Sequence, residues 1–163
     1  MNQLTNNKEI SSGRLFQINI SGGGVPKKSV DVCVVTNLGI VGDRQNNKKV
    51  HGGPQRALCL YSLELLLKLE SEGHPVFPGA LGENLTVTGI DWDLAVPGSR
   101  IRIGDNVLIQ VTSYTSPCKA VRKYFKDEEN DRISDKAHKG WSRVYAKVLQ
   151  AGDTKIGDVV LID

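Results

Sequence analysis

Residues 100–112 have the sequence Arg-Ile-Arg-Ile-Gly-Asp-Asn-Val-Leu-Ile-Gln-Val-Thr. On both sides of the Gly-Asp-Asn at 104–106, aliphatic side chains alternate with polar ones, which is the period of a half-buried strand. Gly-Asp-Asn is typical of a short hairpin connection. The segment therefore predicts a hairpin whose two strands cover residues 100–103 and 107–112.

Strand-like or short apolar runs recur along the rest of the chain. They lie at residues 14–20, 29–36, 56–61, 84–88, 144–149 and 159–162. Within the second run, Val30, Val32 and Val34 share one face and Cys33 lies on the other. About seven short strands with few helices favour a mainly β fold, an antiparallel-rich barrel, over alternating β–α units.

Two helices are expected. Ser62 precedes the leucine-rich run 63–69, and Gly73 follows it, which predicts an amphipathic helix of about three turns with Ser62 as N-cap. A short helix is predicted over residues 119–126, after Pro117. The charged segment 127–139 is expected to be a solvated excursion.

The composition is that of a soluble protein with one core. The chain has 163 residues, 39% of them hydrophobic and 24% charged, and 21 basic against 18 acidic residues give a net charge of +3. We expect a single domain over 1–163, no nucleic-acid partner and no membrane contact, since the charge is mild and no apolar run approaches 18 residues. Three widely spaced cysteines disfavour a disulfide framework and favour a cytoplasmic location.

Four glycine-bearing clusters carry polar groups that could bind an anion. They are 42–44, 51–56, 78–84 and 117–119. Glycine lets backbone N–H groups turn toward an anion, and neighbouring Arg and Lys side chains can complete a phosphate cradle. Any single cluster is more often a turn than a ligand site.

Cys118 is the cysteine best placed for chemistry. A helix start and the cation of Lys119 would lower the pKa of its thiol, making it a metal ligand or a nucleophile, although a small buried hydrophobe is the alternative. Cys33 and Cys59 lie in apolar runs and are predicted to be core residues. His51 is either a general base or ligand, or the cap of a turn. No zinc-ligand spacing, phosphate loop or nucleophile elbow is present.

Trp141 and Arg143 form the last pair with two interpretations. They could pack against an aromatic heterocycle and hold it in place, but an aromatic residue at the start of a strand more commonly packs in the core.

Taken in order, these clusters resemble the MOSC domain, the module named after the C-terminal part of molybdenum cofactor sulfurases, and especially its compact stand-alone bacterial members. The matching residues are Gly42-Asp43, His51-Gly52-Gly53, Gln55-Arg56-Ala57, Tyr61, Pro78-Gly79, Gly82-Glu83-Asn84-Leu85, Pro117-Cys118, Gly140-Trp141, Arg143-Val144 and Gly157-Asp158. They span about residues 40–163. Between Asp43 and His51 this chain carries seven residues where many relatives are shorter.

The resemblance implies a barrel-like β fold and a cofactor, molybdenum held by molybdopterin. It implies Cys118 as metal ligand or sulfur carrier, which suits a soft thiolate donor. Cys118, His51 and Asp43 are the implied catalytic residues. The implied cofactor-binding residues are Arg44, Gly52, Gly53, Arg56, Asn84, Lys119 and Arg143, since Arg and Lys favour phosphate. Pyridoxal phosphate, which belongs to the aminotransferase-like domain of larger members, is not expected.

Two functions follow from the resemblance, and a third needs no cofactor. The first is reduction of N-hydroxylated substrates, such as N-hydroxylated purines, with electrons from an external flavoprotein or other reductase. The second is a carrier of molybdenum cofactor, or of sulfur bound to Cys118. The third is a barrel that binds only a partner protein.

Overall fold

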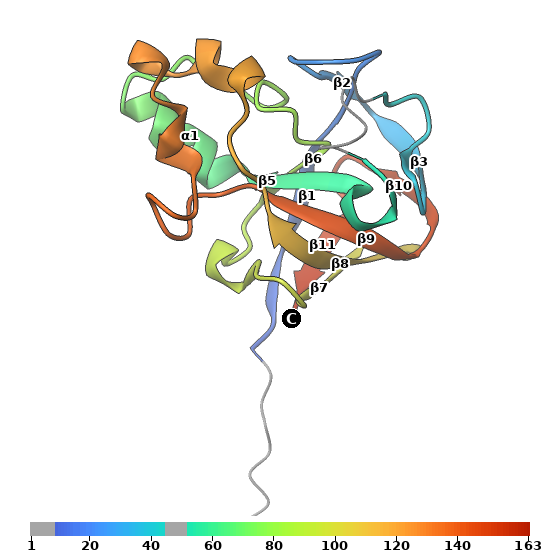
Figure 1. Ribbon diagram of the computed structural model, residues 1–163. Helices are drawn as coiled ribbons and strands as arrows, with labels where there is room; N and C mark the ends of the chain where they lie inside the picture. The colour runs from blue at the N-terminus through green and yellow to red at the C-terminus, as the bar shows by residue number, and fades with distance from the viewer. Residues whose placement is uncertain (1–8, 45–51) are drawn as a thin grey trace, which may run out of the picture.

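A computed structural model describes residues 9–44 and 52–163, and within them the chain folds into strands, one α-helix and five short 3-10 helices (Figure 1). The strands are β1 (Ser11–Ile20), β2 (Lys28–Val30), β3 (Val32–Thr36), β4 (Gly39–Ile40), β5 (Leu58–Ser62), β6 (Leu85–Thr88), β7 (Arg100–Ile103), β8 (Val107–Tyr114), β9 (Val144–Gln150), β10 (Gly152–Lys155) and β11 (Val159–Ile162). The helices are α1 (Leu63–Ser71), η1 (Pro54–Arg56), η2 (Trp92–Leu94), η3 (Lys119–Tyr124), η4 (Lys126–Glu128) and η5 (Asn130–Ile133).

Seven strands close into a barrel, as the sequence predicts. Their order is β11-β7-β8-β9-β5-β6-β1, and β1 pairs with β11 to complete the circle. Strands β5 and β6 are parallel, and the other pairs are antiparallel. β2 adds to β1 outside the circle, and β10, β3 and β4 form a second, smaller sheet.

The hairpin that decides the fold forms as predicted. Ile103 pairs with Val107 and Ile101 with Ile109, and all four side chains are fully buried inside the barrel. Burying alternate aliphatic side chains is the main force that fixes this register, because a slip by one residue would expose the whole set.

The run 29–36 divides at Asp31 rather than forming one strand. β2 pairs with β1, whereas β3 lies between β10 and β4 in the small sheet. In β3 the buried face carries Cys33 and Val35, while Val32 and Val34 point outward and are 65% and 47% exposed. The valine face of the prediction is therefore the solvent face.

Helix α1 begins and ends where the sequence indicates. The Ser62 hydroxyl accepts a hydrogen bond from the Leu65 N–H at 3.3 Å, which satisfies a donor that the first turn leaves without a partner. Leu66 and Leu69 are buried against the barrel. Gly73 follows with a φ of +95°, a conformation that glycine adopts without strain.

The segment after Pro117 differs from expectation in two ways. The predicted short helix over 119–126 forms as the 3-10 helix Lys119–Tyr124 and is interrupted at the extended Phe125, and the centre of 127–139 is packed rather than solvated. Ile133 is fully buried, and the Arg132 guanidinium stacks on the Trp141 ring at 3.7 Å while bonding both carboxylate oxygens of Glu72 at 2.8 and 3.0 Å. These contacts tie the segment to α1.

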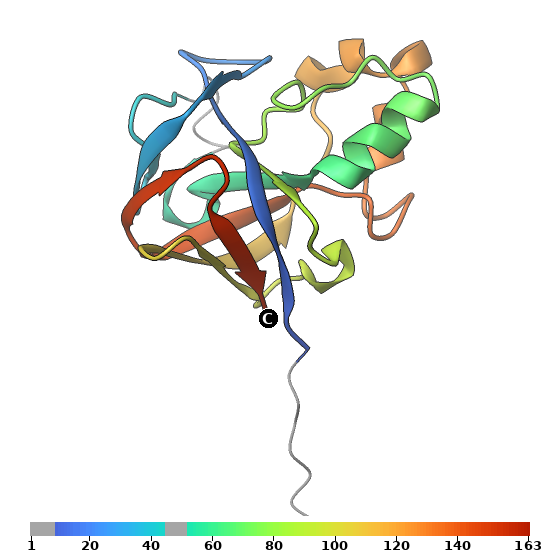
Figure 2. The same ribbon diagram turned by 180° about the vertical axis from the view of Figure 1, so that it is seen from behind.

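Helix α1 and η3–η5 gather at one end of the molecule, and β3 and β10 lie on the other side of the barrel in both views (Figures 1 and 2). In the part of the chain that the structure describes, no helix has the length and apolarity needed to span a bilayer.

Candidate functional site

The outer face of β5 and β9 carries reactive and polar side chains instead of aliphatic ones. Leu58 and Leu60 of β5 point into the barrel. Because side chains alternate along a strand, Cys59 and Tyr61 point away from the barrel. Cys59 pairs with Tyr145 on β9, which places the two side chains next to each other on this outer face.

Asn84 links this face to the N-terminal strands. Its Oδ1 accepts a hydrogen bond from the Cys59 N–H at 3.1 Å. Its Nδ2 donates to Asp43 Oδ2 at 2.8 Å and to the Asn19 carbonyl at 3.3 Å. Every polar atom of the Asn84 side chain is therefore occupied, and its orientation is fixed.

Asp43 forms a buried ion pair with Lys27. The Lys27 Nζ lies 2.6 Å from Asp43 Oδ1, and the two side chains are 7% and 4% exposed. Asp43 Oδ1 also accepts a hydrogen bond from the Ser21 N–H at 2.9 Å. With Asn84 on its other oxygen, Asp43 is engaged by three donors, an arrangement that suits a positioning residue.

Glu83 is a buried carboxyl in the loop that precedes Asn84. Burial raises its pKa, although hydrogen bonds from the Gly79 N–H at 2.5 Å and from the Thr86 hydroxyl at 3.3 Å oppose the shift. Within the described part of the chain, its Oε2 has no hydrogen-bond partner. Gly79 is required here, because a Cβ at this residue would lie 2.3 Å from the Lys27 carbonyl oxygen.

Arg143 is a second buried cation of the site, besides Lys27. It is 4% exposed and joins two loops by donating to the carbonyls of Leu81 and, at 3.4 Å, Ser116. Its Nε is buried and has no hydrogen-bond partner among the residues that the structure describes. Among residues 9–44 and 52–163, no carboxylate lies within ion-pair distance of its guanidinium.

The positive charge of Arg143 acts on its neighbours without ionising them. Burial raises the pKa of the Cys59 thiol to about 12 and also raises the pKa of the Tyr61 and Tyr145 hydroxyls, and Arg143 opposes all three shifts. These groups are therefore neutral hydrogen-bond donors at neutral pH.

Cys118 lies at the mouth of this cluster. It directly precedes η3 and is half-buried, whereas Cys33 and Cys59 are buried. Its carbonyl accepts hydrogen bonds from Asn130 Nδ2 at 2.8 Å and from the Val121 N–H at 3.3 Å, which hold the residue in place. Cys118 is close enough to Cys59 for its charge to raise the pKa of that thiol.

The structure brings several predicted site residues together and separates others. Cys118, Arg143, Asn84 and Asp43 belong to the cluster just described. The half-buried Arg56 lies at its edge, with its guanidinium 5.6 Å from the centre of the Tyr145 ring.

Other predicted site residues lie nearer the solvent. Arg44, Lys119 and Gly53 are exposed, and Gly52 is half-buried next to η1. His51 falls outside the described residues.

Sequence reasoning missed three members of the cluster. Cys59 was predicted to be a core residue, and it is buried, but it faces the polar cluster and not the barrel. Tyr145 and Lys27 were not singled out. The alternation of Leu58 and Leu60 with Cys59 was a usable signal. Lys27 offered none, because its pairing with Asp43 exists only in the folded chain.

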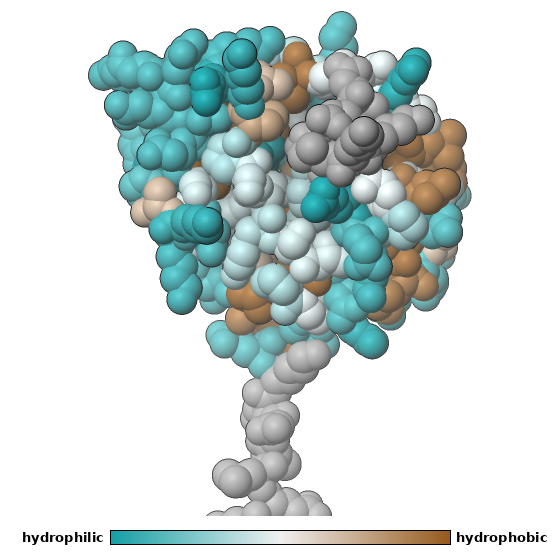
Figure 3. All heavy atoms as spheres, in the orientation of Figure 1, coloured by the Kyte–Doolittle hydropathy of each residue, from teal (hydrophilic) through white to brown (hydrophobic). Residues whose placement is uncertain are grey.

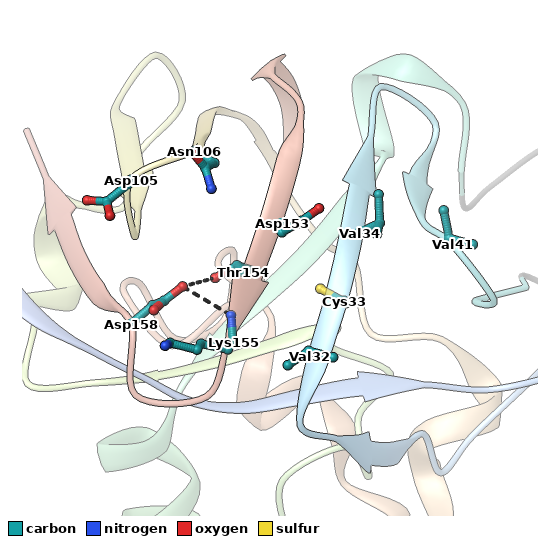
Figure 4. A pocket seen from close by; sticks show the side chains of 10 residues that line it. All are labelled: Val32, Cys33, Val34, Val41, Asp105, Asn106, Asp153, Thr154, Lys155 and Asp158. Atoms are coloured by element: carbon teal, nitrogen blue, oxygen red, sulfur yellow. Dashed lines mark hydrogen bonds between the residues drawn. The ribbon is translucent and has the colours of Figure 1, made fainter.

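A groove of about 650 Å³ lies elsewhere, between β3, β10 and the turn that joins β7 to β8 (Figure 4). Burial, followed by the charge of Asp153, raises the pKa of the Cys33 thiol beside it to about 11. Asp158 is held by the Thr154 hydroxyl at 2.8 Å and the Lys155 N–H at 3.0 Å (Figure 4). No group of three potential metal ligands occurs within the described ranges.

The family to which the chain belongs follows from its match to known proteins. The family model of the MOSC domain matches residues 47–161, which include Arg56, Asn84, Cys118 and Arg143 of the cluster. The chain belongs to the MOSC domain family. MOSC domains are associated in general with molybdenum cofactor binding.

Three curated relatives match this MOSC chain over only part of their own length. It is 35% identical over 113 residues to Protein YiiM of Escherichia coli K12, covering 66% of this chain and 50% of that protein. It is 32% identical over 117 residues to the uncharacterized protein YflK of Bacillus subtilis 168, covering 71% and 52%. A protein named Reductase from Gibberella moniliformis is 28% identical over 127 residues, covering 75% and 22%. The chain thus spans about half the length of the first two.

Solved structures agree with the MOSC fold. YiiM from Geobacillus stearothermophilus matches with a TM-score of 0.69 at 25% identity, covering 93% of this chain and 75% of that one. The YuaD protein of Bacillus subtilis matches with a TM-score of 0.72 at 18% identity, covering 94% and 97%, which shows likeness of fold.

Proposed function

We propose that this MOSC protein binds molybdenum cofactor over the outer face of β5 and β9 and reduces N-hydroxylated compounds such as N-hydroxylated purines. The observation that carries the proposal is the buried positive charge of Arg143. In the described part of the chain its buried guanidinium has an Nε without a hydrogen-bond partner and no carboxylate within ion-pair distance. Glu83, the buried carboxyl whose charge acts on Arg143 from farther away, has a pKa that burial raises. A buried positive charge of this kind is costly, and an anionic ligand would offset the cost.

The residues present fit the anionic pterin and its metal. Arg143 and Arg56 supply cations for a phosphate, which guanidinium groups bind in bidentate fashion. Cys118 supplies a thiolate, the soft donor that suits molybdenum. Asn84, held by Asp43, keeps the β5 backbone at Cys59 in place beneath the site.

When bound, the cofactor supplies two-electron oxygen-atom chemistry. Reduction breaks the N–O bond of the substrate, consumes two electrons and two protons, and releases water. The protein would position Cys118 through Asn130 and exclude bulk water with the two loops that Arg143 joins. The name Reductase of one relative supports a reductive role, and the matched part is about a fifth of that protein's length.

The test is the metal and pterin content of protein purified from a host that makes molybdenum cofactor. Native protein is expected to hold both, and Cys118→Ser to lose molybdenum. Cys33→Ser is the matched control, since Cys33 lies beside the remote groove and should leave the content unchanged. Native protein without molybdenum and pterin would refute the proposal.

Loaded protein is then assayed for reduction of an N-hydroxylated purine with dithionite as electron donor. Turnover supports the reductase. Tight cofactor binding without turnover, or a cyanide-labile sulfur on Cys118, would instead support the carrier function.

A further inference from the structure

A strongly basic strip lies directly beside Cys118. Residues 117–126 contain Lys119, Arg122, Lys123 and Lys126 and no acidic residue, so ten residues carry a charge of +4 while the whole chain carries +3. All four side chains are exposed. Figure 3 shows hydrophilic residues gathered over the end of the molecule that α1 and η3–η5 form.

The geometry of η3 directs these cations outward. In a 3-10 helix the side chains at positions i and i+3 lie on one edge. Val121 and Tyr124 form the inward edge, with Val121 fully buried. Lys119 and Arg122 share a second edge, and Lys123 lies on the third.

Two aromatic side chains adjoin the cations. Phe77 is 45% exposed, and its ring packs edge-on against that of Tyr124 with centroids 5.5 Å apart. The Lys123 Nζ lies 5.2 Å from the centre of the Tyr124 ring. We call Phe77 and Tyr124, together with Lys119, Arg122, Lys123 and Lys126, the basic face. An aromatic centre with a charged rim is typical of protein interfaces.

The basic face is continuous with the candidate site. Cys118 directly precedes η3, and the Val121 N–H donates to its carbonyl. Arg143 joins the Ser116 carbonyl to the loop that follows Phe77 through the Leu81 carbonyl. A protein bound on the basic face would therefore sit at the mouth of the Cys118 site.

The arrangement of the cations indicates the kind of partner. They diverge along the helix and do not converge on one point, which suits an extended acidic surface better than a small anion. The acidic residues Asp127, Glu128 and Glu129 follow immediately and limit the basic face on one side. Charge complementarity of this kind speeds association and orients the partner.

We propose that the basic face docks an acidic FMN protein that delivers electrons to the Cys118 site. The inference rests on the proposed function, whose reaction takes up two electrons and two protons. FMN hydroquinone supplies both when it is oxidised to FMN, so electrons and protons balance: the N–O bond breaks, an N–H forms and water leaves. Transient electron-transfer complexes bury small interfaces, which a face of this size can provide.

The test uses flavodoxin, a small FMN protein with an acidic surface, as the probe. The full chain is titrated with flavodoxin at 20 and 300 mM salt, and binding is followed by the anisotropy of flavin fluorescence. Arg122→Glu/Lys123→Glu reverses two charges of the basic face. Arg100→Glu/Arg102→Glu makes the same change of charge at two exposed residues of β7. The strand β7 lies at the end of the molecule away from η3–η5 (Figure 1).

We expect binding that weakens with salt, as exposed charge pairs do, and an about tenfold higher Kd for the η3 variant at low salt. The β7 variant should bind like the native chain. Carbodiimide, which joins lysine amines to carboxylates in direct contact, should link flavodoxin to Lys123 or Lys126.

Three results would overturn the docking proposal: no binding of flavodoxin, equal loss in the two variants, or cross-links confined to other lysines. The proposed function fails separately, if native protein holds no molybdenum and pterin. If a chain without molybdenum and pterin still binds flavodoxin, only the proposed reductase function is refuted. If a chain that holds the cofactor does not bind flavodoxin, only the docking proposal is refuted.

Discussion

The ion pair between Lys27 and Asp43 offers a sharp test of how the site is held together. Asp43→Asn keeps the shape of the side chain but removes its charge, leaving a Lys27 ammonium that is 7% exposed without a counter-ion. Breaking a buried pair in this way costs about 3–5 kcal/mol. For a domain of this size, each kcal/mol lowers Tm by about 2–4 °C. We therefore expect a fall of about 6–20 °C.

The free energy of unfolding is measured by urea titration for Asp43→Asn, Lys27→Met and the double variant. The double variant should recover most of the loss, because no unpaired charge is left buried. A loss below about 1 kcal/mol in Asp43→Asn, or costs that simply add in the double variant, would refute the buried pair as the link between the N-terminal strands and Asn84.

Three further predictions concern stability. Burial raises the pKa of Glu83, so the native state keeps a proton that the unfolded chain releases above about pH 4.3. The free energy of unfolding should therefore fall as pH rises from there through the raised pKa. Urea midpoints measured against pH should lose this slope in Glu83→Gln. The Arg132 hydrogen bonds lower the pKa of Glu72, so the stabilisation that the Glu72 carboxylate gives the native state should be present above about pH 4.3 and disappear as pH falls through the lowered pKa. An acid-unfolding curve that is unchanged in Glu72→Gln would contradict this. Tyr61→Phe removes the hydroxyl that donates to the Trp141 carbonyl at 2.6 Å and should lower the free energy of unfolding, measured by thermal unfolding, by about 1–3 kcal/mol. An unchanged free energy would mean that water replaces the hydroxyl.

Much of the fold could be predicted because local patterns and tertiary structure agree. The hairpin of β7 and β8 buries its alternating aliphatic residues, and Ser62 caps α1, as the sequence indicates. The division of 29–36 could not be foreseen, since Asp31 marks a change of sheet that depends on which partners β2 and β3 find. β10 escaped notice because Gly152-Asp-Thr-Lys155 has little strand character of its own.

The site was predictable only in part, for a similar reason. Cys118 and Asn84 stand in glycine-bearing clusters that could be recognised from the chain. Tyr145 joins the cluster by pairing with Cys59 across two strands, and Lys27 joins it through its ion pair with Asp43. Neither residue has a local signal. The packing of Arg132 between Trp141 and Glu72 likewise gives a charged residue a partner that its neighbours in sequence do not reveal.

The most direct measurement is the molybdenum and pterin content per chain in native protein and in Arg143→Met, with folding of both checked by circular dichroism. Met keeps most of the side-chain volume and removes the buried charge that we assign to anion binding. We predict near-stoichiometric molybdenum and pterin in native protein and a loss of both in folded Arg143→Met. Native protein free of both, or a variant that retains them in full, would contradict the assignment.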